Sequence, residues 1–469
     1  MYIPLKSERK IAVRKFKFAA KLIAASMAAV SLSVAVLGAE LTDVAGHWSE
    51  QYVKYGVENG YISGYPDGTF LPDKAVTRAE FSKMVNSALG ITKKLETSFP
   101  DVEETDWFHG EVGKALYAGY VSGYEDGSFR AFNNITRQEA AVILSRIATR
   151  PVEALSVDGF SDSKDVADWA KSAMDYAYSK GFFTGDDQGK LNPKATLTRA
   201  QAAKILNMLC TNENVVTGDY TVSLDNGVCS ETIFTDDVYF TAGGDEPTLL
   251  LDGCTVLGNV YLRTPKASVV TVEDSAVNGM VADAGYTAVT LKDGSKVKEI
   301  VLESPAAISG EGAGNIILRG SGLASETTEI LASADSVSVY SDAVIKAGSI
   351  NTLKVNDSAS IILQSGNVKN MEVGSKAAGS VVTLSEGVTV ENLTVSGACS
   401  FMGTGKIVNA NNKVDGVTYA TDPEKITGLP EGSEDKKEEV TGGFAPTVVS
   451  PKKGEAGVAV SAIISVSFE

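Results

Sequence analysis

The fold of the first half of this chain is decided by a stretch that reads Gly-Tyr-Pro-Asp-Gly-Thr-Phe at residues 64–70, followed by Thr-Arg-Ala-Glu at 77–80. The same signature returns as Gly-Tyr-Glu-Asp-Gly-Ser-Phe at 123–129 and Thr-Arg-Gln-Glu at 136–139. An Asp-Gly dipeptide favours a turn that requires a positive φ, and Thr-x-x-Glu is typical of a helix start. Each copy therefore predicts a turn, a short extended piece and a helix.

A third, weaker copy keeps Gly185, Gly189 and Thr-Arg-Ala-Gln at residues 198–201. In every copy a tryptophan precedes the arginine, and the interval between the two is identical in all three. The pairs are Trp48 with Arg78, Trp107 with Arg137, and Trp169 with Arg199. Such a constant register indicates an internal repeat whose units are each too small to close a core alone. We place the repeats at residues 40–96 (repeat 1), 97–157 (repeat 2) and 158–215 (repeat 3).

The helix that follows each Thr-Arg pair carries an apolar stripe at helical spacing. Three stripes can bury one another only if their helices meet, so we predict an all-α bundle of three helices with pseudo-threefold symmetry. The stripes consist of Phe81, Met84, Val85, Ala88 and Leu89, then Ala140, Ile143, Leu144 and Ile147, then Ala202, Ile205, Leu206 and Leu209.

The arginine of each signature lies in the first helical turn, where the helix dipole slightly disfavours a cation. These residues are Arg78, Arg137 and Arg199. Free helix amides together with a forked guanidinium would make a carboxylate receptor, which is the reading we favour. A structural ion pair with a neighbouring repeat is the alternative. We expect the three tryptophans to be packing residues first.

Together these motifs resemble the surface-layer homology (SLH) module of bacterial cell-envelope proteins, over residues 41–212. A Phe-Pro-Asp-Val opening at residues 99–102 adds to the resemblance. The resemblance implies a three-pronged spindle around a helical bundle. It also implies that grooves between the prongs bind a secondary cell-wall polysaccharide, commonly one that carries a pyruvate ketal whose carboxylate meets the arginine.

Carried over position by position, the resemblance implies a set of ligand contacts. These are Asp43, Trp48, Asp67, Gly68, Arg78, Asp101, Trp107, Asp126, Gly127, Arg137, Asp162, Trp169 and Arg199. Repeat 3 departs most from the pattern, because Gln188 replaces the turn aspartate, Leu191 the phenylalanine and Gln201 the glutamate. We therefore expect weaker binding in the groove that depends on that turn.

Residues 1–39 run from basic through apolar to small side chains, which predicts a secretory signal peptide. No further long apolar span follows, so we expect an exported protein without stable membrane insertion, at the cell wall or in a surface layer. The formal net charge is −17, which excludes nucleic acid as a partner. With two histidines and four widely spaced cysteines, we predict no metal site and no cofactor.

From residue 216 to 422, short β-branched runs alternate with Gly, Ser, Asp and Asn. Runs that begin at Val269 and Val289, and at Ile361 and Val381, recur at one constant pitch, as do Met280 and Ile300. Short strands stacked at a constant pitch predict an all-β parallel solenoid resembling a β-helix. A two-sheet sandwich is the alternative, and it would show longer strands without a fixed period.

Solenoids of this kind host polysaccharide lyases and hydrolases, so catalysis must be weighed. A hydrolase needs two carboxylates at a defined separation, and a lyase needs a base. The available acids are Asp283, Asp293, Glu299, Glu303, Asp342 and Glu372, all at turn positions where a solvated acid is the usual finding. We expect a non-catalytic stalk, adhesive surface or self-associating lattice element, with an SLH-anchored polysaccharide-degrading enzyme as the alternative.

Residues 423–444 read as a linker, and residues 445–469 resemble the opening strands of a bacterial immunoglobulin-like domain that is too short to close. The cysteines leave two alternatives open. Cys229 and Cys254 form a disulfide, or they are buried free thiols.

Overall fold

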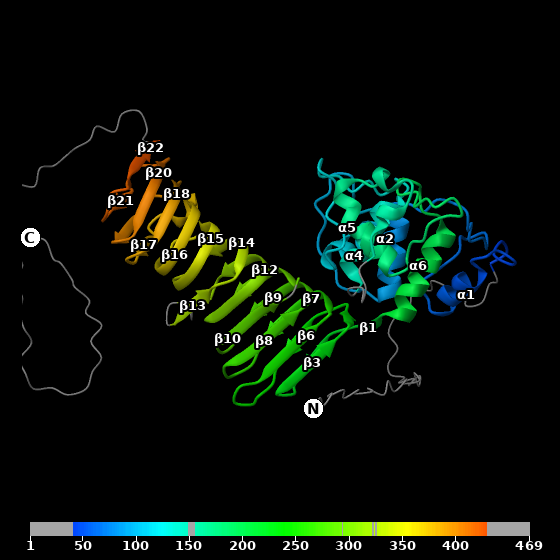
Figure 1. The fold of residues 1–469 in the computed structure, drawn as a ribbon, viewed down its shortest axis with the longest axis horizontal. Coiled ribbons are helices and arrows are strands. Elements are labelled where there is room, and N and C mark those ends of the chain that lie inside the picture. Colours follow the sequence, from blue (N-terminus) through cyan, green and yellow to red (C-terminus); the bar gives the residue numbers. More distant parts are fainter. Residues whose placement is uncertain (1–40, 149–154, 293, 321–322, 324–325, 429–469) are drawn as a thin grey trace, which may run out of the picture.

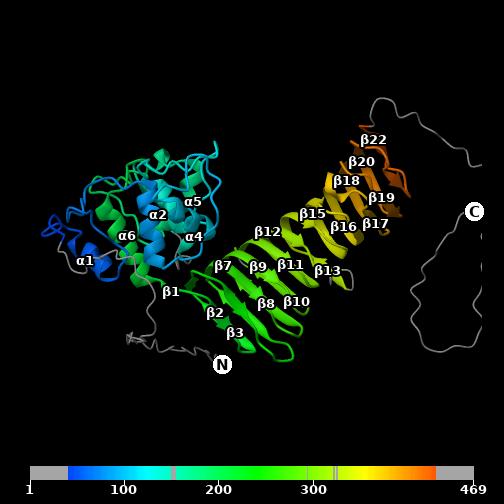
Figure 2. The same cartoon turned by 180° about the vertical axis from the view of Figure 1, so that it is seen from behind.

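The computed structural model describes residues 41–148 and 155–428, except 293, 321–322 and 324–325. A helical bundle leads into a long β-solenoid, and the bundle lies beside the first solenoid turns in both views (Figures 1 and 2). The solenoid then extends away from the bundle to β22. The expected signal peptide (1–39) and immunoglobulin-like segment (445–469) lie outside the described residues, as does the linker beyond residue 428.

Each repeat contributes two helices to the bundle. The α-helices are α1 (Glu50–Glu58), α2 (Arg78–Leu89), α3 (His109–Tyr117), α4 (Arg137–Ile147), α5 (Lys171–Ser179) and α6 (Arg199–Asn212). Short 3-10 helices are η1 (Val157–Gly159), η2 (Ser163–Asp165), η3 (Asp168–Ala170) and, in the solenoid, η5 (Ser375–Ala377).

The predicted capping boxes are present at the start of α2, α4 and α6. Thr77, Thr136 and Thr198 each accept the amide hydrogen of the residue three positions on, whose side chain accepts the threonine amide hydrogen. The glutamine of repeat 3 fulfils this role as the glutamates do. The start of each second helix is therefore set by its local sequence.

The repeats interleave around the pseudo-threefold axis. α3 packs on α2, α5 packs on α4, and α1 packs on α6, so the first helix of each repeat covers the second helix of the preceding one in a closed cycle. The apolar stripes lie in one common core with residues such as Phe70, Phe129 and Leu191. The predicted helical bundle is thereby confirmed, with the first helices supplying much of the contact around the central three.

The solenoid contains 22 parallel strands in about eleven turns across the described residues. They are β1 (Asn214–Val216), β2 (Tyr220–Val222), β3 (Asn226–Ser230), β4 (Thr232–Phe234), β5 (Val238–Phe240), β6 (Thr248–Asp252), β7 (Thr255–Leu262), β8 (Ser268–Glu273), β9 (Ala276–Ala282), β10 (Thr287–Lys292), β11 (Lys296–Leu302), β12 (Ala306–Leu318), β13 (Thr327–Ile330), β14 (Ser333–Val339), β15 (Ala343–Val355), β16 (Ser360–Val373), β17 (Val381–Leu384), β18 (Thr389–Val395), β19 (Ser400–Gly403), β20 (Lys406–Asn412), β21 (Thr418–Tyr419) and β22 (Lys425–Thr427).

Every strand pairs in parallel with strands one turn away, which confirms the solenoid and rules out the sandwich. Met280 pairs with Ile300, as the predicted pitch requires. Val289 pairs with Val270 and Ile361 pairs with Val382, so the period varies by one residue from turn to turn. Side chains alternate in a strand, so such a one-residue change must be absorbed between strands to keep the apolar side chains in the core.

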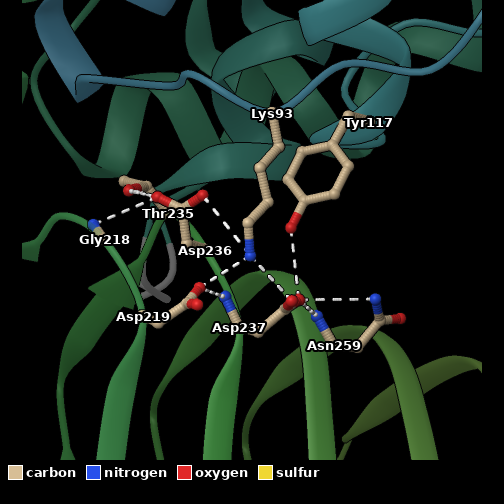
Figure 3. Close-up of polar contacts among 8 residues, drawn as sticks. All are labelled: Lys93, Tyr117, Gly218, Asp219, Thr235, Asp236, Asp237 and Asn259. Atoms are coloured by element: carbon tan, nitrogen blue, oxygen red, sulfur yellow. Dashed lines mark hydrogen bonds and ion pairs between the residues drawn. The ribbon is translucent and has the colours of Figure 1, made fainter.

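The bundle and the solenoid share a polar junction, shown in Figure 3. Lys93 Nζ lies 2.6 Å from Asp219 Oδ1 and 2.7 Å from Asp237 Oδ2. Tyr117 Oη donates to Asp237 Oδ1 over 3.2 Å, and the Asn259 amide donates to the same oxygen over 2.8 Å. The carboxylate of Asp237 is therefore shared between the two parts of the molecule.

The junction also includes apolar contacts. Ile233 of β4 and Leu257 of β7 are buried within the core of the helical bundle. Thr255 Oγ1 donates to the Ala148 carbonyl, and Asn278 Nδ2 donates to the Tyr117 carbonyl at 3.1 Å. These contacts hold the first solenoid turns against the bundle.

All four cysteines are free thiols in the structure. Cys254 Sγ lies 3.2 Å from the carbonyl oxygen of Cys229, and burial raises the pKa of the Cys254 thiol to about 11. Among the described residues, no helix is both long and apolar enough to cross a bilayer.

Candidate functional site

The arginine of each repeat reaches into the next repeat. Arg78 Nε donates to the Phe129 carbonyl at 3.0 Å, Arg137 Nε to the Leu191 carbonyl at 2.8 Å, and Arg199 Nε to the Phe70 carbonyl at 2.7 Å. Each guanidinium also lies over an aromatic ring of that next repeat. The arginines are thus interlocking residues between repeats, whatever else they bind.

The amides at the helix starts are not free, and the expectation that they would help receive an anion is wrong. The Arg78 and Ala79 amides donate to the Asn133 and Ala131 carbonyls of repeat 2. The starts of α4 and α6 make the equivalent bonds to repeats 3 and 1. Because the threonine cap takes a further amide, the amides at these helix starts are satisfied within the protein.

The aspartates of the repeat openings clamp the backbone just after each turn. Asp43 accepts from the Phe70 and Leu71 amides, both at 2.7 Å. The other two make the same pair of bonds, Asp101 with residues 129 and 130 and Asp162 with residues 191 and 192. The second residue of each clamped pair has a positive φ although it is not glycine, namely Leu71, Arg130 and Asn192. These aspartates therefore fix a strained turn.

The turn aspartates Asp67 and Asp126 form hydrogen bonds within their own turns. Asp67 accepts from the Thr69 amide and hydroxyl, and Asp126 does the same with Ser128. Gly68 and Gly127 have φ of +82° and +79°, which a residue with a Cβ rarely adopts. In repeat 3 the Asp186 side chain accepts the Gln188 amide, so the diverged turn keeps the same shape.

Three grooves lie between the repeats, each lined by all three of them. Groove 1 has a volume of about 400 Å³ and contains Tyr65, Glu80, Lys83, Trp107 and Arg199. Groove 2 has a volume of about 600 Å³ and contains Arg78, Tyr124, Asp126, Glu139, Arg146 and Trp169. Groove 3 has a volume of about 340 Å³ and contains Trp48, Arg137, Asp186, Gln201 and Lys204.

The three tryptophans lie on these groove walls, and the expectation that they serve mainly in packing is wrong. Trp48, Trp107 and Trp169 are 52%, 53% and 60% exposed. Each lies on the repeat that follows the one supplying the groove's turn and second helix. A large aromatic face held in water beside polar groups is typical of a binding surface.

Of the predicted ligand contacts, the structure brings Trp48, Trp107, Trp169, the three arginines and Asp126 to the groove linings. The remaining predicted contacts do not line these grooves and shape the turns instead. They are Asp43, Asp67, Asp101 and Asp162, with Gly68 and Gly127. The sequence reasoning missed Tyr65 and Tyr124, which were visible in the repeated Gly-Tyr-x-Asp-Gly motif. It also missed Lys83 and Lys204, which only packing brings to a groove.

The charge around the arginine differs between the grooves. Arg199 Nη1 lies 3.9 Å from Glu80 Oε1, and Arg78 Nη1 lies 3.8 Å from Glu139 Oε1. Burial alone would raise the pKa of Glu80, but the Thr77 amide and the Tyr65 hydroxyl outweigh it and lower that pKa. Both glutamates are therefore ionised at neutral pH and face an arginine, as the ion-pair alternative proposed.

In groove 3 Gln201 occupies the position of Glu80 and Glu139, and the carboxylates that act on Arg137 are the more distant Asp162 and Asp186. Among the described residues, Arg137 forms no ion pair within 4.0 Å, and burial lowers its pKa. Its outer nitrogen Nη2 donates to the Thr184 carbonyl at 3.2 Å. Arg137 is also less buried than Arg78 and Arg199. Within the described part of the chain, Arg137 is thus the one of the three arginines without a carboxylate inside 4.0 Å.

This threefold arrangement agrees with a match to known proteins. The model of the S-layer homology domain matches residues 40–82, 98–141 and 159–203. The chain carries three SLH domains. The SLH domains correspond to repeats 1, 2 and 3, and the three grooves lie between them.

Several characterised proteins are similar over this region. The chain is 32% identical over 214 residues to the surface-layer 125 kDa protein of Lysinibacillus sphaericus, which covers 43% of the chain and 17% of that protein. It is 33% identical over 137 residues to the cellulosome-anchoring protein of Acetivibrio thermocellus, which covers 28% of the chain and 30% of that protein. It is 30% identical over 178 residues to exoglucanase XynX of the same species, which covers 37% of the chain and 16% of that protein. The chain thus spans less than a third of each of these relatives.

The SLH domains and the S-layer relatives indicate an SLH-anchored protein at the cell-wall surface, and they imply binding to cell-wall polysaccharide. Among the described residues, no group of three or more His, Cys, Asp and Glu side chains is placed to hold a metal ion.

Proposed function

We propose that this protein is a non-catalytic surface protein whose three SLH grooves bind an acidic, pyruvate-bearing secondary cell-wall polysaccharide. The observation that carries the proposal is the repeated pairing of an exposed tryptophan with a guanidinium in one groove. A sugar ring stacks on the tryptophan, and its acidic substituent lies against the arginine. Three grooves on one body would add their contributions on a polymeric ligand.

The arginine can both link two repeats and contact a ligand, because different nitrogens of its guanidinium make these contacts. In Arg199, Nε donates to the Phe70 carbonyl and Nη2 to the Ser63 carbonyl, while Nη1 faces the groove side with Glu80 at 3.9 Å. The interlock therefore fixes the guanidinium plane before a ligand arrives. A pre-oriented guanidinium loses little conformational entropy on binding an anion.

We propose further that groove 3 takes the acidic substituent most strongly. Arg137 faces a neutral glutamine, and Lys204 and Lys190 line the same groove. In grooves 1 and 2 a glutamate already compensates the arginine. The sequence alone led us to expect weaker binding here, but the retained turn and the lack of a close carboxylate at Arg137 among the described residues favour the opposite order.

The solenoid would act as a stalk, adhesive surface or lattice element. Three of the acids considered for catalysis form other contacts. Asp283 pairs with Arg263 at 2.8 Å, Asp342 accepts from the Ser360 amide, and Glu372 lies 3.9 Å from Lys354. Asp293 falls outside the described residues. The alternative, a wall-anchored polysaccharide-degrading enzyme, draws support only from relatives such as exoglucanase XynX, which align over the SLH region.

A wall-sedimentation assay tests the anchoring proposal. Trp48→Ala, Trp107→Ala and Trp169→Ala combined should lower affinity for purified polysaccharide-bearing walls by at least about tenfold, since aromatic anchors dominate such contacts. Phe132→Ala is the matched control, because Phe132 is 70% exposed and is not among the residues lining the three grooves. If the triple variant sediments as well as the parent, the grooves do not anchor the protein.

The role of the solenoid needs a separate assay. The purified full chain is incubated with wall polysaccharide and with polygalacturonate, and reducing ends and unsaturated uronates are measured. We expect no product above a heat-treated sample. Time-dependent product that disappears in one of the variants Asp283→Asn, Glu299→Gln or Glu303→Gln would establish the enzyme alternative.

A further inference from the structure

A cleft of about 640 Å³ lies between the helical bundle and the solenoid. One wall comes from the bundle, with Ser145 and Arg146 of α4 and Trp169 of η3. The other comes mainly from β7, β9, β11 and β12 of the solenoid, and it includes Lys296 and Lys298 of β11. The polar junction around Lys93 and Asp237 holds these walls in place (Figure 3).

The cleft adjoins groove 2. Val142, Arg146 and Trp169 line both spaces, so the same indole and the same guanidinium are available from either side. Trp169 is the most exposed of the three tryptophans, at 60%. A polymer that leaves groove 2 past Trp169 would therefore enter the cleft.

Three cations, Arg146, Lys296 and Lys298, line the cleft. Among the described residues, no carboxylate lies within 4.0 Å of the charged groups of Arg146, Lys296 or Lys298. Arg146 Nη1 donates to the Tyr120 carbonyl, and Lys298 Nζ donates to Asn278 Oδ1 at 3.4 Å. Asp335 is the one acid of the lining. In a chain with a net charge of −17, such an excess of uncompensated positive charge is unusual.

Several small residues belong to the lining of the cleft. Gly119, Ala173 and Ala276 belong to the lining, as do Gly312 and Gly314 of β12. At Gly312 a Cβ would lie 1.8 Å from the Ser295 carbonyl oxygen, so the solenoid packing itself keeps this position free of a side chain.

We propose that the cleft is a second carbohydrate-binding site, in which the solenoid extends groove 2 and binds further acidic units of the same polysaccharide. This inference rests on the proposed function of the SLH grooves. Trp169 would stack a sugar at the entrance, and Arg146, Lys296 and Lys298 would each meet an anionic substituent. The solenoid then takes part in anchoring, and the protein recognises a longer stretch of polymer than its SLH domains alone could reach.

The test compares two lengths of wall polysaccharide against the full chain by calorimetry. One fraction is short enough to fill a single groove, and the other spans several repeating units. Lys296→Ala with Lys298→Ala should weaken binding of the long fraction by about tenfold, since contacts of a cation with an anion are strong. Binding of the short fraction should not change. Oligogalacturonides and glycerol-phosphate oligomers, tested in the same way, distinguish carboxylate from phosphate as the favoured group.

The matched control is Lys369→Ala with Lys413→Ala, which removes the same charge from exposed positions further along the solenoid. Lys369 follows Val368 in β16 as Lys298 follows Val297 in β11, several turns away from the bundle. The inference is overturned if the parent binds both lengths equally, or if the control weakens the long fraction as much as the cleft variant. If the parent binds neither fraction, the groove proposal fails as well.

Discussion

The guanidinium of Arg199 donates through Nε to the carbonyl of Phe70 at 2.7 Å, across 129 residues of sequence. This contact closes the ring of three SLH domains, because Arg78 and Arg137 already link repeat 1 to repeat 2 and repeat 2 to repeat 3. Each SLH domain therefore depends on its neighbour for the shape of its own groove.

The ring predicts a large effect of Arg199→Ala on stability. The side chain is buried, and its loss leaves the Phe70 and Ser63 carbonyls without their donors. We expect the free energy of unfolding of the bundle to fall by about 2–3 kcal/mol, measured by urea denaturation. Arg199→Lys should recover only part of it, since one ammonium cannot reproduce the fork.

Arg130→Ala serves as its control, because Arg130 is more exposed and pairs with Asp126 on the surface. Its loss should leave the urea midpoint nearly unchanged, because exposed ion pairs contribute little to stability. Equal losses for the two variants would contradict the interlocking role of Arg199.

A second prediction concerns the neutral position of groove 3. Gln201→Glu keeps the capping box but places a carboxylate opposite Arg137, as Glu80 and Glu139 lie opposite the other arginines. The affinity for wall polysaccharide should fall about two- to fivefold, while stability stays the same. Glu80→Gln is the converse variant and should raise affinity. No change in either variant would show that this charge does not govern binding.

The junction between bundle and solenoid gives a third prediction. Lys93→Ala leaves Asp219 and Asp237 without their cation. Because Lys93 is partly exposed, we expect a loss of about 1–2 kcal/mol, between the values for exposed and buried pairs. Hydrogen exchange should show faster opening of β2 and β5. Lys171→Ala, which removes an exposed pair with Asp158, should leave these strands unchanged.

The same junction predicts a dependence on pH. Burial alone would raise the pKa of Asp237, but Lys93 and the Asn259 amide outweigh it and lower that pKa below its ordinary value of 3.8. The stabilisation is therefore complete above about pH 4 and is lost as the pH falls further. The difference in urea midpoint between the parent and Asp237→Asn should be constant from pH 5 to 8 and shrink towards pH 2. A constant difference down to pH 2 would contradict this assignment.

The thiols provide a fifth prediction. Burial raises the pKa of Cys210, Cys254 and Cys399 to about 11, and raises that of Cys229. At pH 8 the thiolate fraction of such groups is on the order of one in a thousand, so reaction with a disulfide reagent should be slow in the folded protein. In denaturant all four should react. Two reactive thiols in denaturant would show a disulfide in their place.

Local sequence was sufficient to predict the helix starts and the stacked strands of this protein. The capping boxes at Thr77, Thr136 and Thr198 formed as predicted, because the two side chains involved lie one helical turn apart. The solenoid was predictable for a related reason, since each turn contacts only its neighbours and repeats their apolar pattern. Its register was not, because a shift by a single position changes the pitch very little but exchanges the two faces of a strand.

What the sequence determined by itself, then, is the threefold repeat, its turns and helix starts, and the parallel solenoid, since all of these arise from interactions between residues close in the chain or one period apart. Only the tertiary structure decided which residues share a groove, that the arginines interlock the repeats, and that α4, η3 and β11 enclose a cationic cleft. The physical reason is that the interlocking contacts join segments far apart in the chain, such as Arg78 with Phe129 and Arg199 with Phe70, and their geometry depends on how whole repeats pack.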